Sequence, residues 1–296
     1  MKIAVLSDIH ANQEALESVL NDAERRGAER FWFLGDAVGY GPDPQAPLLW
    51  LKYYLDHGEW VLGNHDAFFA GLVSKDTDGD VSPTALRALE LNRKRLDLPE
   101  NAEASQFCQA ELQPGRIHPV QCNLDGVDYV LVHSSQKDPL GLHRSVYAWQ
   151  EDIFLPQEFA ALEERSLTSG RPSIQLYGHT HVPTLVYGQR VGEDFAYHAV
   201  KVCPGQTYSL EAGLAIINPG SVGFPRDRDN RAAYTLLDTA GRMLTFLRVG
   251  YDWMETAQKL AREGYPDLLR NRLRFADVAG DTPQDWKKHF EKVREC

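Results

Sequence analysis

Residue types that bind metal ions follow five short apolar runs in this chain. Each run has the length and composition of a buried β-strand, and the polar residues stand where that strand would end. Their side chains are carboxylates, one amide and imidazoles, with no thiolate. This mixture suits divalent Mn, Fe, Co, Ni or Zn better than a site built of oxygen ligands alone. The segments are VLSDIH with Asp8 and His10, FLGD with Asp36, VLGNHD with Asn64, His65 and Asp66, VLVH with His133, and LYGHTH with His179 and His181.

Two of these segments place a pair of metal-binding residues two positions apart. Residues two apart in an extended segment point to the same side, so Asp8 and His10 are expected to hold one ion together. His179 and His181 lie where the chain leaves a strand, and a bend there lets the pair reach two neighbouring ions. The two oxygens of Asp36 can bridge such ions. Two ions roughly 3.5–4 Å apart form the clamp used for in-line displacement at phosphorus.

The first sixty residues alternate between short apolar runs and helical patterns. Asn12 is a suitable helix N-cap and Gly27 ends that helix, and a second helix is expected over Gln45–His57. A β-α-β-α-β order predicts parallel strands, and open α/β sheets bind their ligands beyond the carboxyl ends of such strands. The expected strands are Ile3–Leu6, Phe31–Leu34 and Trp60–Leu62.

The second half of the chain is rich in short β-like runs, with hairpin turns near residues 124–126 and 239–242 and a helix near Pro156–Arg165. Together the two halves predict an α/β fold, with a two-sheet mixed β sandwich flanked by helices. The further expected strands are Ile117–Asn123, Val127–Val132, Ser173–Tyr177, Thr184–Tyr187, Phe195–Val202, Leu214–Ile217, Ala233–Asp238 and Met243–Arg248.

The predicted organisation is a main domain over residues 1–250 and a helical tail over residues 251–296 packed on it. A polar stretch from about 71 to 115 is expected to be a helical insertion over one edge of the core, with helices over Pro83–Leu96 and Ala102–Leu112. The first tail helix is predicted from an apolar stripe of Trp253, Met254, Ala257 and Leu260.

Composition narrows the classes of function. The 296 residues carry a formal net charge of −11, which repels nucleic-acid backbones, so broad nucleic-acid binding is not expected. The four scattered cysteines predict no disulfide framework and are typical of a reducing compartment. No run approaches the roughly 20 apolar residues that a membrane-spanning helix needs, and the N-terminus does not resemble a signal peptide. These features predict a cytoplasmic protein.

The order of the motifs resembles a known family. DxH, GDxV, GNHD, a lone histidine after a strand and GHTH follow one another as in the calcineurin-like metallophosphoesterases, over roughly residues 1–238. GYGPDP (residues 39–44) and NPGSVGFPRDRD (residues 218–229) are similar to the compact bacterial and archaeal branch of that family, which resembles phosphodiesterases and dinucleoside polyphosphate hydrolases. The resemblance implies a four-layer α/β/β/α fold.

The resemblance also implies two divalent metal ions and a role for each matching residue. His65 would stand beside the reacting phosphate and protonate the leaving group, and Asp66 would orient His65 or a metal ligand. A metal-activated water would attack phosphorus. Asp8, His10 and His181 match the ligands of the first ion, Asp36 matches the bridging ligand, and Asn64, His133 and His179 match the ligands of the second ion.

Three further residues are weaker candidates for contact with substrate. Tyr40 can stack on a nucleobase or simply shape the GYGPDP loop. Arg226 can bind a distal phosphate through its planar guanidinium, although a surface ion pair explains it nearly as well. His143 follows the segment that contains His133 and is a third candidate.

The predicted function is that of a dinuclear metal-dependent phosphoesterase acting on a phosphodiester or a dinucleoside polyphosphate. A phosphomonoesterase or phosphoprotein phosphatase is the alternative enzyme, because one set of metal ligands serves several phosphate esters. A non-catalytic binding scaffold of the same fold is the alternative from another class. The expected partner is a small phosphorylated or nucleotide substrate, not a membrane, and the sequence leaves the oligomeric state open.

Overall fold

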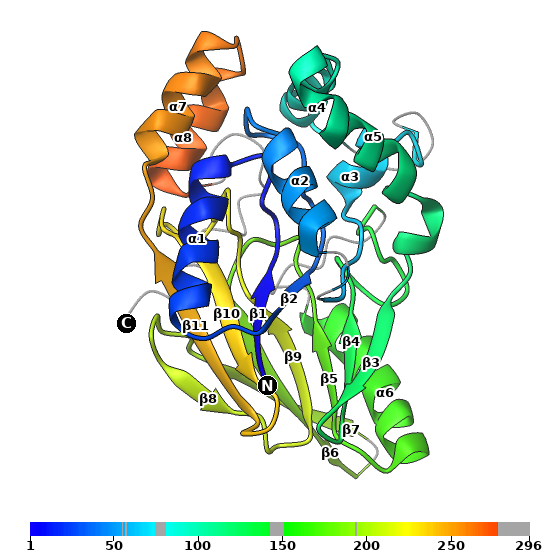
Figure 1. Cartoon of the computed structure of the whole chain (residues 1–296). Coiled ribbons are helices and arrows are strands. Elements are labelled where there is room, and N and C mark those ends of the chain that lie inside the picture. Colours follow the sequence, from blue (N-terminus) through cyan, green and yellow to red (C-terminus); the bar gives the residue numbers. More distant parts are fainter. Residues whose placement is uncertain (55, 57, 75–80, 143–150, 193, 278–296) are drawn as a thin grey trace.

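The computed structural model of the chain describes residues 1–54, 56, 58–74, 81–142, 151–192 and 194–277. Two β-sheets form its centre (Figure 1). The first has the order β2-β1-β10-β11-β8, with β1 (Lys2–Leu6), β2 (Arg30–Phe33), β8 (Thr207–Ser209), β10 (Ala232–Asp238) and β11 (Met243–Val249). The second has the order β3-β4-β5-β9-β6-β7, with β3 (Val120–Leu124), β4 (Val127–Leu131), β5 (Ser173–Leu176), β6 (Thr184–Val191), β7 (Asp194–Val200) and β9 (Leu214–Asn218).

Both sheets are mixed, as expected. In the first sheet β1 pairs in parallel with β2 and antiparallel with β10. In the second sheet β4, β5 and β9 are parallel neighbours, and the outer pairs are antiparallel. Parallel pairing brings the carboxyl ends of neighbouring strands to one edge, and this edge carries the expected metal-binding segments.

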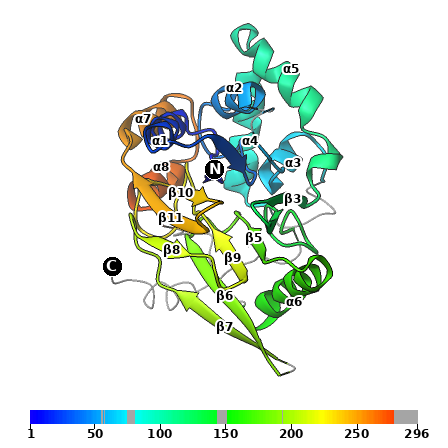
Figure 2. The same cartoon turned by 60° about the horizontal axis from the view of Figure 1, so that its bottom comes forward.

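Helices cover the outer faces of the sheets and complete the four layers (Figure 2). Side chains along β1 point alternately to the two faces of the first sheet, and both faces are buried. Ile3 and Val5 face the second sheet, while Ala4 and Leu6 join the core beneath α1. On the other outer face, α6 packs Phe159 and Leu162 against the second sheet. The helices are α1 (Gln13–Arg25), α2 (Gln45–Tyr54), α3 (Asn64–Phe69), α4 (Pro83–Leu96), α5 (Ala102–Glu111), α6 (Glu151–Ser169), α7 (Trp253–Arg262) and α8 (Asp267–Phe275), with short 3-10 helices at Pro99–Asn101 and Pro114–Arg116.

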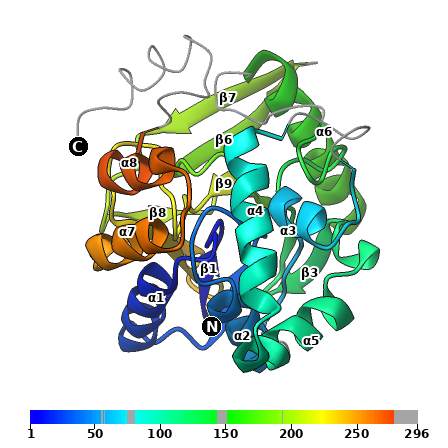
Figure 3. The same cartoon turned by 90° about the horizontal axis from the view of Figure 1, so that it is seen from above.

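The expected insertion helices and the first tail helices lie above the edge of the sheets that carries the metal-binding segments. Seen from above, α4 lies beside α7 and α8 over the ends of the first strands (Figure 3). A small apolar cluster joins these helices to two loops. Its buried members are Tyr40, Ala85, Ala88, Phe224, Leu260, Tyr265, Leu269 and Leu273.

Two expectations for these elements were wrong. The predicted strand Trp60–Leu62 is only a single bridge between Trp60 and Phe33. The Leu62 backbone donates to Arg116 O at 2.9 Å instead of extending the ladder, and the chain then turns into α3. The predicted apolar stripe of the tail fails at Met254, which is 57% exposed.

Among the described residues, Cys108 and Cys122 are free thiols. Within the described ranges, no helix has both the length and the apolar character needed to cross a membrane.

Candidate active site

The expected metal ligands come from loops that follow β1, β2, β4 and β5, and from the start of α3. Backbone hydrogen bonds tie these loops together. Asp8 N donates to Gly35 O at 3.0 Å, and Gly178 N donates to His133 O at 2.9 Å. The two sheets are joined where His179 N donates to Asp8 Oδ2 at 3.1 Å. The five sequence segments therefore converge at one place, as the strand-end interpretation predicts.

The loops hold most of these residues in left-handed backbone conformations. Non-glycine residues with positive φ are uncommon and cost roughly 1–3 kcal/mol each, so they persist at sites that the surrounding contacts enforce. The extended-pleat explanation for the spacing of Asp8 and His10 is therefore wrong, because both residues have already left the strand. The residues are Asp8, His10, Asp36, His179 and His181, with φ values of 54°, 49°, 62°, 65° and 62°.

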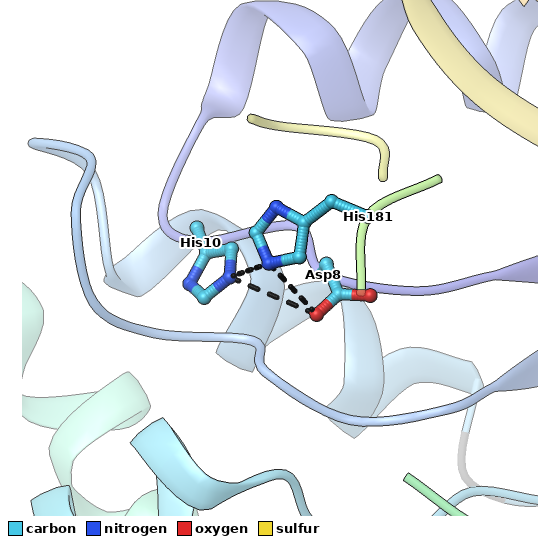
Figure 4. A group of neighbouring side chains, drawn as sticks. All are labelled: Asp8, His10 and His181. Atoms are coloured by element: carbon cyan, nitrogen blue, oxygen red, sulfur yellow. Dashed lines mark hydrogen bonds and ion pairs between the residues drawn. The ribbon is translucent and has the colours of Figure 1, made fainter. Parts of the chain in front are cut away.

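One group of side chains consists of Asp8, His10 and His181 (Figure 4). His181 Nε2 lies 3.2 Å from Asp8 Oδ1 and 3.1 Å from His10 Nε2. His10 Nε2 lies 3.8 Å from Asp8 Oδ1. Their ligand atoms lie within 4.8 Å of one another, and all three residues are buried. The three residues expected to hold the first ion are thus brought together.

The second group contains Asn64, His133 and His179. Asn64 Oδ1 lies 3.0 Å from His133 Nε2 and 3.1 Å from His179 Nδ1. Asp36 stands between the two groups, because its Oδ2 lies 3.5 Å from His133 Nε2 and 3.5 Å from His10 Nε2. One carboxylate oxygen equidistant from both groups has the placement expected of a bridging ligand.

Backbone carbonyls set the tautomers of three histidines. His10 Nδ1 lies 3.1 Å from Val38 O, His133 Nδ1 lies 2.7 Å from Leu34 O, and His181 Nδ1 lies 2.5 Å from Phe224 O. A carbonyl can only accept, so each Nδ1 carries the hydrogen and each Nε2 presents a lone pair to the site.

The arrangement fits bound cations. In the neutral histidines His10 and His181, two Nε2 lone pairs face each other across 3.1 Å. The Nε2 lone pair of His133 likewise faces Asn64 Oδ1, another acceptor, across 3.0 Å. Acceptors facing each other in a buried site repel unless a positive charge lies between them. The nitrogen and oxygen donors suit the first-row divalent ions expected from the sequence.

Burial controls the ionisation of the histidines. It lowers the pKa values of His10, His133, His179 and His181, and it lowers the pKa of His65 to about 3. Neighbouring positive groups, including the Arg226 guanidinium, act in the same direction. The imidazoles are therefore neutral near pH 7, which is the form that coordinates a metal ion.

The two carboxylates expected to bind metal, Asp8 and Asp36, differ in their environments. Burial raises the pKa of Asp36 well above its usual range, and the charges of Asp66 and Asp8 add to that shift. Burial also acts to raise the pKa of Asp8, but His181 and the Ser7 hydroxyl outweigh it, and the pKa of Asp8 lies below its usual range. Cations at the site would favour the ionised form of both residues.

His65 and Asp66 begin α3 and have different surroundings. His65 is 5% exposed, its ring centroid lies 4.7 Å from that of His10, and no hydrogen-bond partner for its Nδ1 is found in the part of the chain that the structure describes. Asp66 accepts hydrogen bonds from four backbone N–H groups, those of Asp36 at 2.8 Å, Ala37 at 2.9 Å, Val38 at 3.1 Å and Gly63 at 3.1 Å. Asp66 thus holds the backbone that carries Asp36.

Two of the three weaker candidates lie at the site. Tyr40 is only 6% exposed, and its ring centroid is 4.5 Å from each of the rings of His10 and His65. Arg226 is half-buried, and its Nη2 donates to the Tyr40 hydroxyl at 3.4 Å. Its charge contributes to the low pKa of His65. His143 lies outside the described residues.

The loop between β9 and β10 supports the site in a way that the sequence interpretation missed. Ser221 Oγ and Gly223 N donate to Asp8 O at 2.8 and 3.0 Å, and Phe224 O accepts from His181. The available signal was the cluster of Gly, Pro and Ser in NPGSVGFP, directly after an apolar run.

Known proteins are similar to this chain in sequence and fold. Residues 1–242 match the profile of the calcineurin-like phosphoesterase superfamily domain. The crystal structure of a metallophosphoesterase from Sphaerobacter thermophilus is 30% identical, covers 93% of this chain and 99% of that chain, and superposes with a TM-score of 0.69. An uncharacterised protein of Methanocaldococcus jannaschii is 28% identical over 271 residues, which are 92% of this chain and 96% of that relative.

A shorter match involves a symmetrical bis(5'-nucleosyl)-tetraphosphatase of Edwardsiella ictaluri. It is 32% identical over 88 residues, covering 28% of this chain and 32% of that enzyme. The full-length profile match, the two-sheet fold and the grouped carboxylates, amide and imidazoles agree with one another. This chain belongs to the calcineurin-like phosphoesterase superfamily.

Proposed function

We propose that this protein is a dinuclear metal-dependent phosphoesterase that hydrolyses a phosphodiester or a dinucleoside polyphosphate. The observation that carries the proposal is the position of Asp36 Oδ2, which lies 3.5 Å from both His10 Nε2 and His133 Nε2. A carboxylate oxygen between two groups of ligands suits two ions that share one ligand. Two bound divalent ions would neutralise a phosphate and activate water.

The chain supplies the groups that hold these ions and the groups that act on the substrate. Asp66 keeps the Asp36 loop in place through its four hydrogen bonds. His65 would stand beside the phosphate held by the ions and, in its protonated form, would donate a proton to the leaving oxygen. Asp8, His10 and His181 would hold one ion, Asn64, His133 and His179 the other, and Asp36 both.

The role of His65 is tested by His65→Ala. If His65 assists the leaving group, kcat should fall by about 10²–10⁴-fold while both metal ions remain bound. Metal content by elemental analysis and kcat with an aryl phosphodiester give the two readouts. An unchanged kcat would exclude the acid role.

A substrate with more than one phosphate is supported by two observations. Arg226 lies beside Tyr40 at the edge of the ligand groups and can bind a second phosphate through its planar fork. The partial match to a symmetrical bis(5'-nucleosyl)-tetraphosphatase points to the same chemical class.

A substrate panel tests this choice. Hydrolysis of p-nitrophenyl phosphate, bis(p-nitrophenyl) phosphate and diadenosine tetraphosphate should be compared with Mn, Fe, Co, Ni and Zn in turn. We expect the diester or the tetraphosphate to be turned over faster than the monoester. Activity on the monoester alone would support the phosphomonoesterase or phosphoprotein phosphatase alternative. Two bound metals without turnover of any ester would support the scaffold.

A further inference from the structure

Asn92, on helix α4, binds the loop that carries Tyr40 at the candidate active site. Asn92 has no exposed surface, and its amide makes three hydrogen bonds. Oδ1 accepts from Gly39 N at 2.7 Å, while Nδ2 donates to Gly41 O at 2.8 Å and to the Tyr265 hydroxyl at 2.9 Å. One amide therefore joins the insertion, the loop of residues 39–41 and the helices at the end of the chain.

The loop that Asn92 holds is strained and lies against the His10 loop. Gly39 and Tyr40 have φ values of 90° and 50°. Gly41 N donates to His10 O at 2.9 Å, and a Cβ on Gly41 would stand 2.3 Å from that oxygen. Left-handed backbone persists only where its surroundings over-determine it. Asn92 supplies two of the required bonds, one on each side of Tyr40.

Tyr40 transmits the position of this loop to the site. Its ring packs 4.5 Å from the rings of His10 and His65, and its hydroxyl accepts from Arg226 Nη2. A displacement of Tyr40 would therefore move His65 and Arg226 together. A misplacement of about 1 Å at a reacting group can cost on the order of 100-fold in rate.

Asn92 and Asp66 together hold one continuous segment, residues 36–41, by hydrogen bonds. Asp66 binds the N–H groups of residues 36–38, and Asn92 binds residues 39 and 41. Asp66 belongs to the GNHD motif, whereas Asn92 lies on α4 outside the metal-binding motifs, and its partner Tyr265 lies beyond residues 1–242, which match the family profile.

We propose that Asn92 is a positioning residue for phosphoester hydrolysis, whose amide fixes the Gly39–Gly41 loop so that Tyr40 holds His65 and Arg226 toward the substrate phosphate. This inference rests on the proposed function. It gives helix α4 a part in turnover through the two hydrogen bonds of Asn92 to the loop.

The test compares Asn92→Leu with Asn101→Leu. Asn101 is also a buried asparagine of the insertion, and its Nδ2 donates to Arg95 O at 2.7 Å, away from the loop. Both variants lose a buried amide of similar size, so they separate positioning from general stability. Tyr265→Phe removes one hydroxyl and leaves both loop bonds of Asn92 intact.

We expect Asn92→Leu to keep two metal ions and to lose about 10- to 100-fold in kcat, with a higher KM for bis(p-nitrophenyl) phosphate. The kcat values of Asn101→Leu and Tyr265→Phe should stay within about threefold of the wild-type value. In the metal-free proteins, the ring resonances of His10 and His65 should shift in Asn92→Leu and not in Asn101→Leu. If Asn92→Leu does not fold, Asn92→Asp keeps the acceptor for Gly39 and gives the same comparison.

The positioning role would be overturned if Asn92→Leu had the same kinetic constants and the same histidine resonances as Asn101→Leu. The proposed function fails separately, if the metal-loaded wild type hydrolyses no phosphate ester. In that case the resonances test the loop alone: shifted His10 and His65 signals in Asn92→Leu would show that Asn92 fixes the position of Tyr40 beside these histidines, and unshifted signals would overturn that role.

Discussion

At the scale of single residues, Asp36 is the side chain that joins the two ligand groups. An asparagine at this position would have one carbonyl oxygen and no charge, so its side chain could not coordinate two cations equally. Asp36→Asn should therefore lower metal content and kcat together, with kcat falling at least on the order of 100-fold. Elemental analysis and turnover of a phosphodiester measure the two effects.

A matched control for this variant is Asp128→Asn. Asp128 is another buried carboxylate, 7% exposed, and lies on β4, the strand that precedes His133. It forms an ion pair with Arg171 at 2.9 Å. The Asp128→Asn variant should keep both metal ions. Full two-metal content in Asp36→Asn would contradict the bridging role.

His65 should make the metal-free protein sensitive to acid. Burial lowers the pKa of His65 to about 3, whereas an unfolded histidine titrates near 6.5. As the pH falls from 7 to 5, the unfolded state binds a proton that the folded state does not, so the free energy of unfolding falls. For His65 alone this loss is about 2 kcal/mol.

His65→Gln removes that contribution, because glutamine does not titrate. Between pH 7 and 5, the free energy of unfolding of the variant should fall by about 2 kcal/mol less than that of wild type. Urea unfolding with a chelator present measures this difference. His118→Gln, at an exposed histidine, should behave as wild type. Equal acid sensitivity of wild type and His65→Gln would show that His65 is not buried as neutral imidazole.

At the scale of the elements, the start of α3 depends on a close approach to the Asp36 loop. A Cβ on Gly63 would stand 2.0 Å from Asp36 Oδ1 and 2.5 Å from Asp36 N. Gly63 has an ordinary φ of −95°, so the conflict is steric alone. Gly63→Ala should displace the carboxylate, lower metal content and destabilise the fold by about 1–3 kcal/mol.

Gly115→Ala is the control, because nothing lies within 4 Å of the added methyl group. Its free energy of unfolding should stay within about 0.5 kcal/mol of the wild-type value, and it should keep its metal ions. Urea unfolding and elemental analysis separate the two variants. Gly63→Ala with normal metal content would contradict the crowding at Asp36.

At the scale of the whole molecule, metal binding should contribute to stability. The ligands come from both sheets, so bound ions would hold the two halves of the sandwich together. At a free ion concentration 100 times its dissociation constant, one site adds about 2.7 kcal/mol, which corresponds to a rise of several degrees in Tm. Calorimetry with EDTA and then with excess Mn measures this difference.

Asp36→Asn should show a smaller rise in Tm on addition of Mn than wild type, since it weakens both ligand groups. The same scan on Gly115→Ala should reproduce the wild-type rise. A Tm that is equal with EDTA and with Mn in wild type would argue against metal sites that join the sheets.

The sequence by itself determined the fold class and the candidate ligand set. Apolar runs and helical spacing are local, so the strands β1, β2 and β5 and the helix α4 could be predicted to within a residue or two. The order of metal-capable residues after those runs predicted which side chains would meet. The predicted strand at Trp60–Leu62 failed because a distant carbonyl, Arg116 O, competes for its backbone.

Only the tertiary structure decided how those side chains face one another. The tautomers of His10 and His181 depend on Val38 O and Phe224 O, which long-range folding brings to them. The position of Asp36 Oδ2 midway between two imidazoles is likewise a contact between two sheets. Asn92 belongs to no motif, and its role depends on the packing of α4 over the loop, because the hydrogen bonds of one buried amide join segments that lie far apart in the sequence.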